Sequence, residues 1–547
     1  MIKRIYLITV CFFVIINLFA QSELLTIAEE SNFLTTSKNE EVIGFINQLK
    51  KLTKNILVEK YITSTEGYEV PLLIIADPLP ILKDNQYVSD GRTVVYIQAN
   101  IHAGEVEGKE ACLMLARDIL TKKKKEEILK NIILLICPNF NPDGNQKISK
   151  ENRKHQNGPL NGVGLRYNGQ MLDINRDALK AETPEMQVLL TEVLNKWDPA
   201  VFVDCHTTNG SYHEEPITFT WMSNGNTDRK LINYMRDEMM PAVSKTLSEK
   251  YKTDNCFYGE FKDLLRPEKG WESYAYEPRY LTNYIGLRNR LAILNENYVY
   301  ADYKTRVLGC YNLLWSILEY TSANSKKINM LIDSVDFNIT KRGLNPLPSD
   351  SFAITFECKP TPEKITIKAF EVDSGYNPNS YMPYIKTERK KTVTVPYYAD
   401  YFPKTNIKFP FAYIINIYDK QCIDLLLLHG IKVEKLKDSC TLNVESFIIT
   451  ELSPSLRLNQ GHYTNSMKGT TIAEKKFFAA GTYLVRTAQP LANIASYLLE
   501  PQLEDGMVYW NYFDKYLVPQ WGTQFNPYPV YKVLEKMELN SILYLSK

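Results

Sequence analysis

Four apolar runs separated by helical patterns constrain the fold of this chain more than any other feature of its sequence. They cover residues 93–100, 131–138, 199–206 and 290–296. The first two are nearly continuous in apolar residues, which is typical of strands buried on both faces. Helical periodicity predicts helices over residues 105–121, 184–197, 228–248 and 302–321. Strands that alternate with helices predict an α/β fold in which helices cover a central sheet.

The pattern changes after residues 321–329, a polar segment that we interpret as a domain boundary. Beyond it, strand-like runs are interrupted by proline and glycine, and one helical run stops at Gly430. A chain of 547 residues is long enough for two hydrophobic cores. We therefore expect an α/β domain over residues 21–325 and a second, strand-rich α+β accessory domain over residues 331–547.

Residues 1–20 have the features of a signal peptide. Lys3 and Arg4 precede a long apolar run, and Ala20 is a small residue at a plausible cleavage point. The run is too short to predict a membrane span, and no later run is long and apolar enough. We expect an exported protein, periplasmic or secreted, without a membrane span in its mature form.

Charge and cysteine content exclude several classes of protein. The formal net charge is +1, which gives no reason to expect a nucleic acid partner. Apart from Cys11 the chain has eight cysteines and no CxxC motif, so a dense disulfide framework is not expected. One or two disulfide bonds are left open.

Two of the six histidines lie where a metal site would need them. His102 and Glu105 follow the strand at 93–100, and His206 ends the strand at 199–206. Two histidines and one glutamate at strand ends match a catalytic zinc site with an open fourth position. An HxxE pair occurs often by chance, so this reading depends on His206 as the third ligand.

The chain resembles the M14 metallocarboxypeptidases, the carboxypeptidase A-like zinc exopeptidases, over roughly residues 90–320. The resemblance rests on an ordered set of motifs: HxxE at 102–105, NPDG at 141–144, DINRD at 173–177, the histidine at 206 and ILNENY at 293–298. It implies a mixed β-sheet flanked by helices and one catalytic Zn²⁺. His102, Glu105 and His206 match the family's metal ligands.

The resemblance also implies roles for four residues that do not bind the metal. Asp173 matches the carboxylate that orients the first histidine ligand. Asn175 and Arg176 match the pair that binds the terminal carboxylate of the substrate, for which a guanidinium fork is well suited. A surface ion pair of Arg176 with Asp177 or Glu182 is the alternative. Glu296 matches the catalytic glutamate, which can move a proton between water and the leaving amine.

Two family roles have competing candidates. An arginine that stabilises the oxyanion should lie downstream of NPDG, where the expected spacing falls near Gln156. Arg153 is the nearest arginine and Arg166 the second. The family's mobile substrate-binding tyrosine is expected at Tyr274, and Tyr284 is a further candidate. Tyr276 and Tyr280 compete with both.

These features together predict an exported zinc carboxypeptidase. Its substrates would be peptides with a free C-terminal carboxylate. A zinc-dependent amidase acting on N-acyl amino acids or cell-wall peptides is one alternative on the same scaffold. A binding protein with a decayed site is another, although the presence of Glu296 beside three ligands argues against it.

Overall fold

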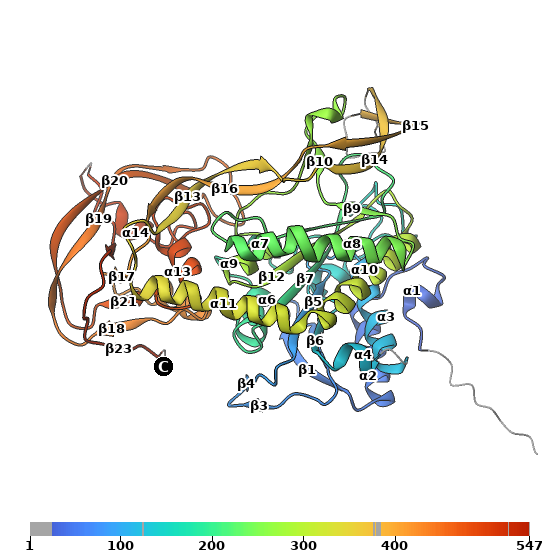
Figure 1. Ribbon diagram of the computed structural model, residues 1–547, viewed down its shortest axis with the longest axis horizontal. Helices are drawn as coiled ribbons and strands as arrows, with labels where there is room; N and C mark the ends of the chain where they lie inside the picture. The colour runs from blue at the N-terminus through green and yellow to red at the C-terminus, as the bar shows by residue number, and fades with distance from the viewer. Residues whose placement is uncertain (1–23, 123–124, 376–377, 379–383, 523, 546–547) are drawn as a thin grey trace, which may run out of the picture.

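The structure is a computed structural model that describes residues 24–122, 125–375, 378, 384–522 and 524–545. Its centre is an eight-stranded sheet in the order β1-β2-β6-β5-β7-β12-β8-β9 (Figure 1). Its strands are β1 (Ile56–Thr63), β2 (Glu69–Ile75), β5 (Thr93–Ala99), β6 (Ile132–Cys137), β7 (Val201–Thr208), β8 (Ile217–Trp221), β9 (Asn255–Phe257) and β12 (Leu291–Tyr298). The expected signal peptide lies outside the described residues.

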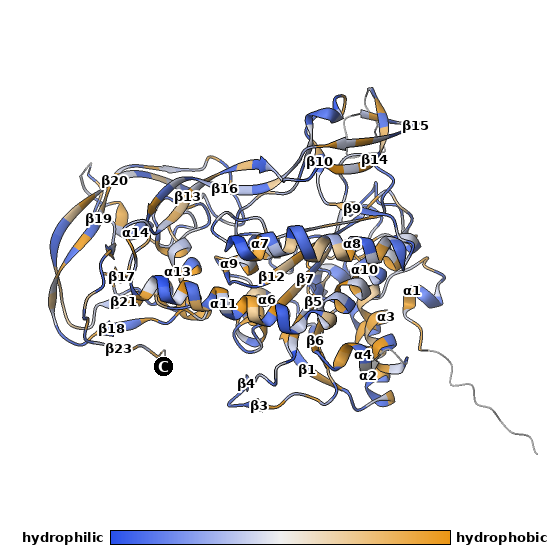
Figure 2. Cartoon of the chain, viewed as in Figure 1, coloured by the Kyte–Doolittle hydropathy of each residue, from blue (hydrophilic) through white to orange (hydrophobic). Residues whose placement is uncertain are grey.

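The four middle strands run parallel and carry the core. β5 pairs in parallel with β6 and β7, and β7 pairs in parallel with β12. Every residue of β5 and β6 is buried, because helices cover both faces of a parallel sheet. Antiparallel β2 and β8 flank the parallel strands, so the sheet is mixed. Apolar residues concentrate in these central strands (Figure 2).

Helices lie along the sheet where the sequence predicts them (Figure 1). The principal ones are α2 (Asn39–Leu52), α3 (Glu107–Thr121), α6 (Pro184–Val188) continued by η2 (Leu189–Leu194), α7 (Arg229–Tyr234) continued by η3 (Met235–Met239) and α8 (Met240–Glu249), α9 (Leu281–Leu287), α10 (Tyr303–Ala323) and α11 (Ser325–Leu344). The segment 139–183 contains only α5 (Pro142–Gln146) and the single turn η1 (Ile174–Arg176). That long loop carries several of the expected site residues.

The polar segment 321–329 is helical rather than a linker. α10 ends at Ala323 and α11 begins at Ser325, so only Asn324 separates the two helices. Ile328, Ile332, Val335 and Ile339 are buried at helical spacing, and this apolar stripe stabilises α11 although its outer face is polar.

The C-terminal region is rich in strands and confirms the expected fold class. A seven-stranded sheet has the order β20-β19-β22-β17-β21-β18-β23 and is drawn in orange and red in Figure 1. Its strands are β17 (Ala412–Ile415), β18 (Glu434–Leu436), β19 (Cys440–Pro454), β20 (Asn465–Phe478), β21 (Tyr483–Arg486), β22 (Val530–Val533) and β23 (Ser541–Leu543), and its helices are α12 (Lys420–Leu428), α13 (Ala492–Leu499) and α14 (Asp514–Leu517).

A four-stranded sheet, β10-β11-β16-β13, joins the two parts of the chain. β10 (Glu260–Phe261) and β11 (Trp271–Glu272) precede the C-terminal region, whereas β13 (Ser351–Pro360) and β16 (Tyr397–Lys408) belong to it. Between them, β14 (Ile365–Ser374) and β15 (Tyr384–Val395) form an antiparallel arm at the top of Figure 1. The two parts therefore share a sheet.

The structure also bears on cysteines and membranes. The eight cysteines in the described part of the chain are all free, and most are buried in the core. Among the described residues, no helix is both long enough and apolar enough to cross a membrane.

Candidate active site

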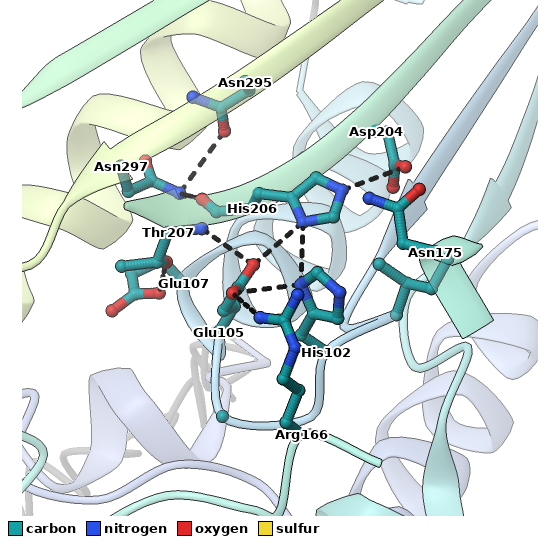
Figure 3. Close-up of polar contacts among 12 residues, drawn as sticks. His102, Glu105, Glu107, Arg166, Asn175, Asp204, His206, Thr207, Asn295 and Asn297 are labelled. Carbon is teal, nitrogen blue, oxygen red and sulfur yellow. Dashed lines mark hydrogen bonds and ion pairs between the residues drawn. The ribbon is translucent and has the colours of Figure 1, made fainter. Parts of the chain in front are cut away.

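Three expected metal ligands converge at the C-terminal ends of β5 and β7 (Figure 3). His102 and Glu105 lie in the turn that connects β5 to α3, and His206 lies on β7. Nδ1 of His102 is 3.0 Å from Oε1 of Glu105, and Nδ1 of His206 is 2.9 Å from Oε2. The two Nδ1 atoms are 3.2 Å apart. All three side chains are buried.

Carboxylates behind the two imidazoles fix their orientation. Nε2 of His102 is 3.0 Å from Oδ1 of Asp173, and Nε2 of His206 is 3.0 Å from Oδ2 of Asp204. An imidazole that donates Nε2–H to a carboxylate presents a lone pair at Nδ1, which is the state a metal ligand needs. His102 meets this condition through its hydrogen bond with Asp173, whereas Asp204 faces His206 as an ion-pair partner.

The converging atoms fit a zinc ion. Two Nδ1 lone pairs and a carboxylate oxygen within 3.2 Å repel one another unless a cation or a proton lies among them. Tetrahedral zinc with bonds of about 2.0–2.2 Å holds its ligand atoms about 3.3 Å apart, close to the separations found here. Without a metal, a proton on His206 can take that place. Burial disfavours the charged imidazole, but Asp204 and Glu105 hold the pKa of His206 well above its ordinary value.

Further contacts hold Glu105 in its charged form. Its Oε2 accepts a hydrogen bond from the backbone N–H of Thr207 at 3.0 Å, and Arg153 pairs with its Oε1. Burial alone would raise the pKa of Glu105, but the nearby charges of His102 and Arg153 lower it well below its ordinary value. The glutamate is therefore ionised over the whole physiological range.

Glu296 lies beside His206, because these two residues are paired across β12 and β7. It lines a cavity of about 420 Å³ together with the three candidate ligands. Burial raises the pKa of Glu296 to about 8, and the charge of Glu105 adds to this effect against the opposing attraction of His206. A carboxylate with a raised pKa can both accept and return a proton near neutral pH.

Both candidate oxyanion arginines line this cavity. Arg153 donates to the backbone oxygen of Thr207 at 3.2 Å in addition to its contact with Glu105. Arg166 donates to Oδ2 of Asp173 at 2.9 Å. Its guanidinium lies 3.6 Å from Glu105 (Figure 3). The geometry brings both guanidinium groups to the site.

The expected carboxylate-binding pair lies on η1 and also lines the cavity. Oδ1 of Asn175 accepts the backbone N–H of Leu281 at 3.0 Å, which leaves the amide –NH₂ as its donor group. The guanidinium of Arg176 stacks on the ring of Tyr280 at 4.4 Å. The neighbouring Asp177 binds Lys180 instead, at 2.6 Å, so the surface ion pair considered for Arg176 does not form with it.

The tyrosines divide into two groups. Tyr274 lines the cavity as expected, and Tyr258 and Tyr280 line it too. Tyr284 was expected near the substrate, but the structure places it elsewhere. It is fully buried on α9, and its hydroxyl lies 2.7 Å from Nδ1 of His429. Its position on the inner face of a helix, which the sequence pattern did not reveal, excludes it from the cavity.

A hydrogen bond from the C-terminal region reaches the site, and no signal in the sequence predicts it. Oε1 of Gln460 accepts the backbone N–H of Asp173 at 2.8 Å. Gln460 lies in a tight turn between β19 and β20, in which Asn459 and His462 exchange backbone hydrogen bonds. Nε2 of His462 lies 2.9 Å from Glu182 and anchors the turn. No sequence motif marks Gln460, since its role depends on a residue 287 positions earlier.

Comparisons with known proteins relate the chain to carboxypeptidases. Residues 42–284 match the sequence model of the zinc carboxypeptidase family. Carboxypeptidase 2 of Trichophyton rubrum is 20% identical over 489 residues, covering 85% of this chain and 82% of its own. A probable carboxypeptidase 2 of Arthroderma benhamiae is 20% identical over 499 residues, covering 86% of this chain and 84% of its own.

Solved structures that resemble the chain include a metallo-carboxypeptidase from Pseudomonas aeruginosa, at 16% identity and a TM-score of 0.38, covering 54% of this chain and 70% of that one. Carboxypeptidase A from Helicoverpa armigera is 17% identical at a TM-score of 0.38, covering 53% of this chain and 74% of that one.

Proposed function

We propose that the chain is a metallopeptidase-type hydrolase that removes residues from the C-terminus of peptides with a zinc-activated water. The match of residues 42–284 to the zinc carboxypeptidase family and the similarity to a curated carboxypeptidase support this proposal. The observation that carries this proposal is the convergence of His102, Glu105 and His206 beside Glu296 in one cavity. No specific observation favours an amidase or a binding protein.

A bound zinc ion would polarise the scissile carbonyl and lower the pKa of a bound water to about 7. With zinc bound, Glu296 would take a proton from the water as the water oxygen forms a bond to the scissile carbonyl carbon, and it would deliver that proton to the amide nitrogen as the C–N bond breaks. Its pKa near 8 in the metal-free protein suits an acid that must both accept and donate. A nearby dication lowers this pKa, so the carboxylate form is available at neutral pH.

Recognition of the C-terminus is assigned to the η1 turn. Arg176 can donate two parallel hydrogen bonds to a carboxylate, and the amide of Asn175 adds a third donor. Stacking on Tyr280 holds the guanidinium plane in place before substrate binds. A substrate with a free terminal carboxylate therefore positions its last peptide bond at the metal.

Stabilisation of the oxyanion is assigned to Arg153, with Arg166 as the second candidate. A guanidinium in a partly buried cavity stabilises developing negative charge more strongly than it would in water. Arg153 is the first choice because its side chain is less exposed than that of Arg166, at 16% against 33%.

Replacement of Glu296 by glutamine tests the mechanism. The variant keeps the shape of the side chain but removes proton transfer, so turnover of a peptide should fall by at least about 100-fold while bound zinc, measured by mass spectrometry, stays unchanged. Glu272→Gln is the matched control, because Glu272 is on β11 and does not line the cavity. Retained turnover in Glu296→Gln would remove the role assigned to this residue.

We also propose that residues 1–20 direct export and are removed. The basic start at Lys3 and Arg4, the apolar run and Ala20 support this assignment. Sequencing the N-terminus of the protein recovered outside the cytoplasm tests it. A mature chain that still begins at Met1 would contradict it.

We propose further that residues 331–547 form an accessory domain that shapes the site. The contact of Gln460 with Asp173 supports this role.

A further inference from the structure

A second group of metal-binding side chains lies apart from the active-site cavity. His213 and Glu215 precede β8, and Cys256 is on the adjacent strand β9. Their ligand atoms all lie within 4.8 Å of one another, and all three residues are buried. None of them lines the active-site cavity. The group therefore needs an explanation of its own.

Two polar atoms in this group lack hydrogen-bond partners. Nδ1 of His213 and Oε2 of Glu215 are both among the buried atoms that no donor or acceptor satisfies within the described part of the chain. They lie 3.5 Å apart, so they face each other without forming a hydrogen bond. Buried polar groups are nearly always satisfied, and an unsatisfied pair that faces a thiol indicates a missing partner.

Surrounding contacts hold these side chains in place. Oε1 of Glu215 accepts the backbone N–H of Lys368 at 2.9 Å, which directs Oε2 toward the histidine. The ring of His213 stacks on Tyr298 at 3.9 Å and meets the edge of Trp271 at 6.0 Å. The group is therefore preorganised by its neighbours rather than by contacts among its own members.

We propose that His213, Glu215 and Cys256 bind a second divalent cation of the zinc type. The donor set combines an imidazole nitrogen, a carboxylate oxygen and a cysteine sulfur, which are the three protein donors that zinc accepts. The sulfur disfavours magnesium and calcium, which require oxygen ligands. On binding, Cys256 releases its thiol proton to solvent and the thiolate forms the bond to the metal, so charge and protons balance.

Binding of zinc would require the three ligand atoms to move only slightly closer together. Tetrahedral zinc with these donors places its ligand atoms about 3.3–3.7 Å apart. His213 and Glu215 are already at 3.5 Å, so the sulfur must approach by about 1 Å at most to satisfy this geometry. Cys256 also lines a separate cavity of about 660 Å³, so the thiol side of the group borders an open space.

The position of the site indicates a structural role. Strand β14 of the protruding arm is attached to the sheet through the same residues, since His213 forms a bridge with Ala369 and Glu215 binds Lys368. A cation at this point would fasten the arm to the catalytic part. This inference is independent of the proposed peptidase activity.

Cobalt substitution tests the proposal directly. The active-site ligands contain no sulfur, so a thiolate-to-cobalt absorption band in the cobalt-loaded wild type can arise only from a second site. We expect this band in the wild type, its loss in Cys256→Ser and its retention in Cys358→Ser, a half-buried thiol outside the group. Zinc content at saturation should be two ions per chain for the wild type and one for Cys256→Ser.

The opposite results would overturn the proposal. A wild-type protein with one zinc and no sulfur-to-cobalt band would show that His213 and Glu215 form a buried pair only. Both of these measurements use the intact wild-type chain, so they decide the question even if Cys256→Ser fails to fold. A band retained in a folded Cys256→Ser variant would assign the sulfur to another cysteine and also reject the site.

Discussion

Replacing Gln460 by alanine tests whether the C-terminal region supports catalysis. The side chain of Gln460 holds the backbone N–H of Asp173, and Asp173 in turn binds both His102 and Arg166. Loss of this acceptor frees the start of the η1 turn, which also carries Arg176. The perturbation therefore reaches the metal ligand and the carboxylate clamp through one hydrogen bond.

The size of the effect follows from that bond. A hydrogen bond within a protein contributes about 0.5–1.5 kcal/mol net, and a partly buried donor left without a partner loses about 1–3 kcal/mol. If the net contribution is lost from the transition state, kcat/KM falls by about 2- to 10-fold. The fall should appear in both kcat and KM, because the loosened η1 turn carries Arg176 and the partner of His102.

The assay is steady-state hydrolysis of a peptide with a free C-terminus, with zinc content measured in parallel. Leu458→Ala is the matched control, because Leu458 lies in the same turn region and is 63% exposed without a contact to Asp173. Equal kcat/KM for Gln460→Ala and the wild type would refute a positioning role for this residue. Deleting residues 331–547 is a poorer test, because it cuts α11 and removes the partner strand of β11.

Two further predictions concern Arg176 and His429. Arg176→Ala should lower kcat/KM by about 10- to 100-fold for a peptide with a free C-terminus, because charged hydrogen bonds contribute about 1.5–3 kcal/mol. The same peptide with an amidated C-terminus is the comparison. Equal losses for the two peptides would contradict the role of Arg176 in binding the terminal carboxylate. Burial lowers the pKa of His429 to about 3, so the folded state binds one proton fewer than the unfolded state between pH 3 and about 6.5. This contribution to stability is complete above about pH 6.5 and is lost as the pH falls toward 3, by up to about 1.4 kcal/mol per pH unit. Urea unfolding at pH 5 and 7 should therefore show a flatter pH dependence for His429→Gln, and an unchanged slope would contradict it.

The sheet was predictable from the sequence because its strands obey local rules. Residues 93–99 and 132–137 are apolar at nearly every position, and the structure buries all of them. The helical segment at 325–344 was not predictable in the same way. Its polar start, SKKIN, masks an apolar stripe that is completed only by later turns of the helix.

The candidate site also contains residues that the sequence could predict and residues that it could not. His102, Glu105 and Glu296 could be placed because each follows an apolar strand, and parallel strands bring their ends to one edge. The sequence could not show which tyrosine lines the cavity. Tyr274 lies in the loop after β11 and Tyr284 lies on the inner face of α9, and no sequence pattern distinguishes these positions. Gln460 was out of reach, because its contact forms between loops that no periodic pattern describes.

The sheet formed by β10, β11, β16 and β13 has a consequence for how the protein is made. A ribosome delivers β11 long before β16, and the N-terminal part of a nascent chain begins to fold first. Until Tyr397 and Tyr398 have emerged, β11 lacks a partner on one side and presents an open strand edge of the kind that invites wrong pairing. The sheet that joins the two parts is therefore completed only after most of the chain has been synthesised.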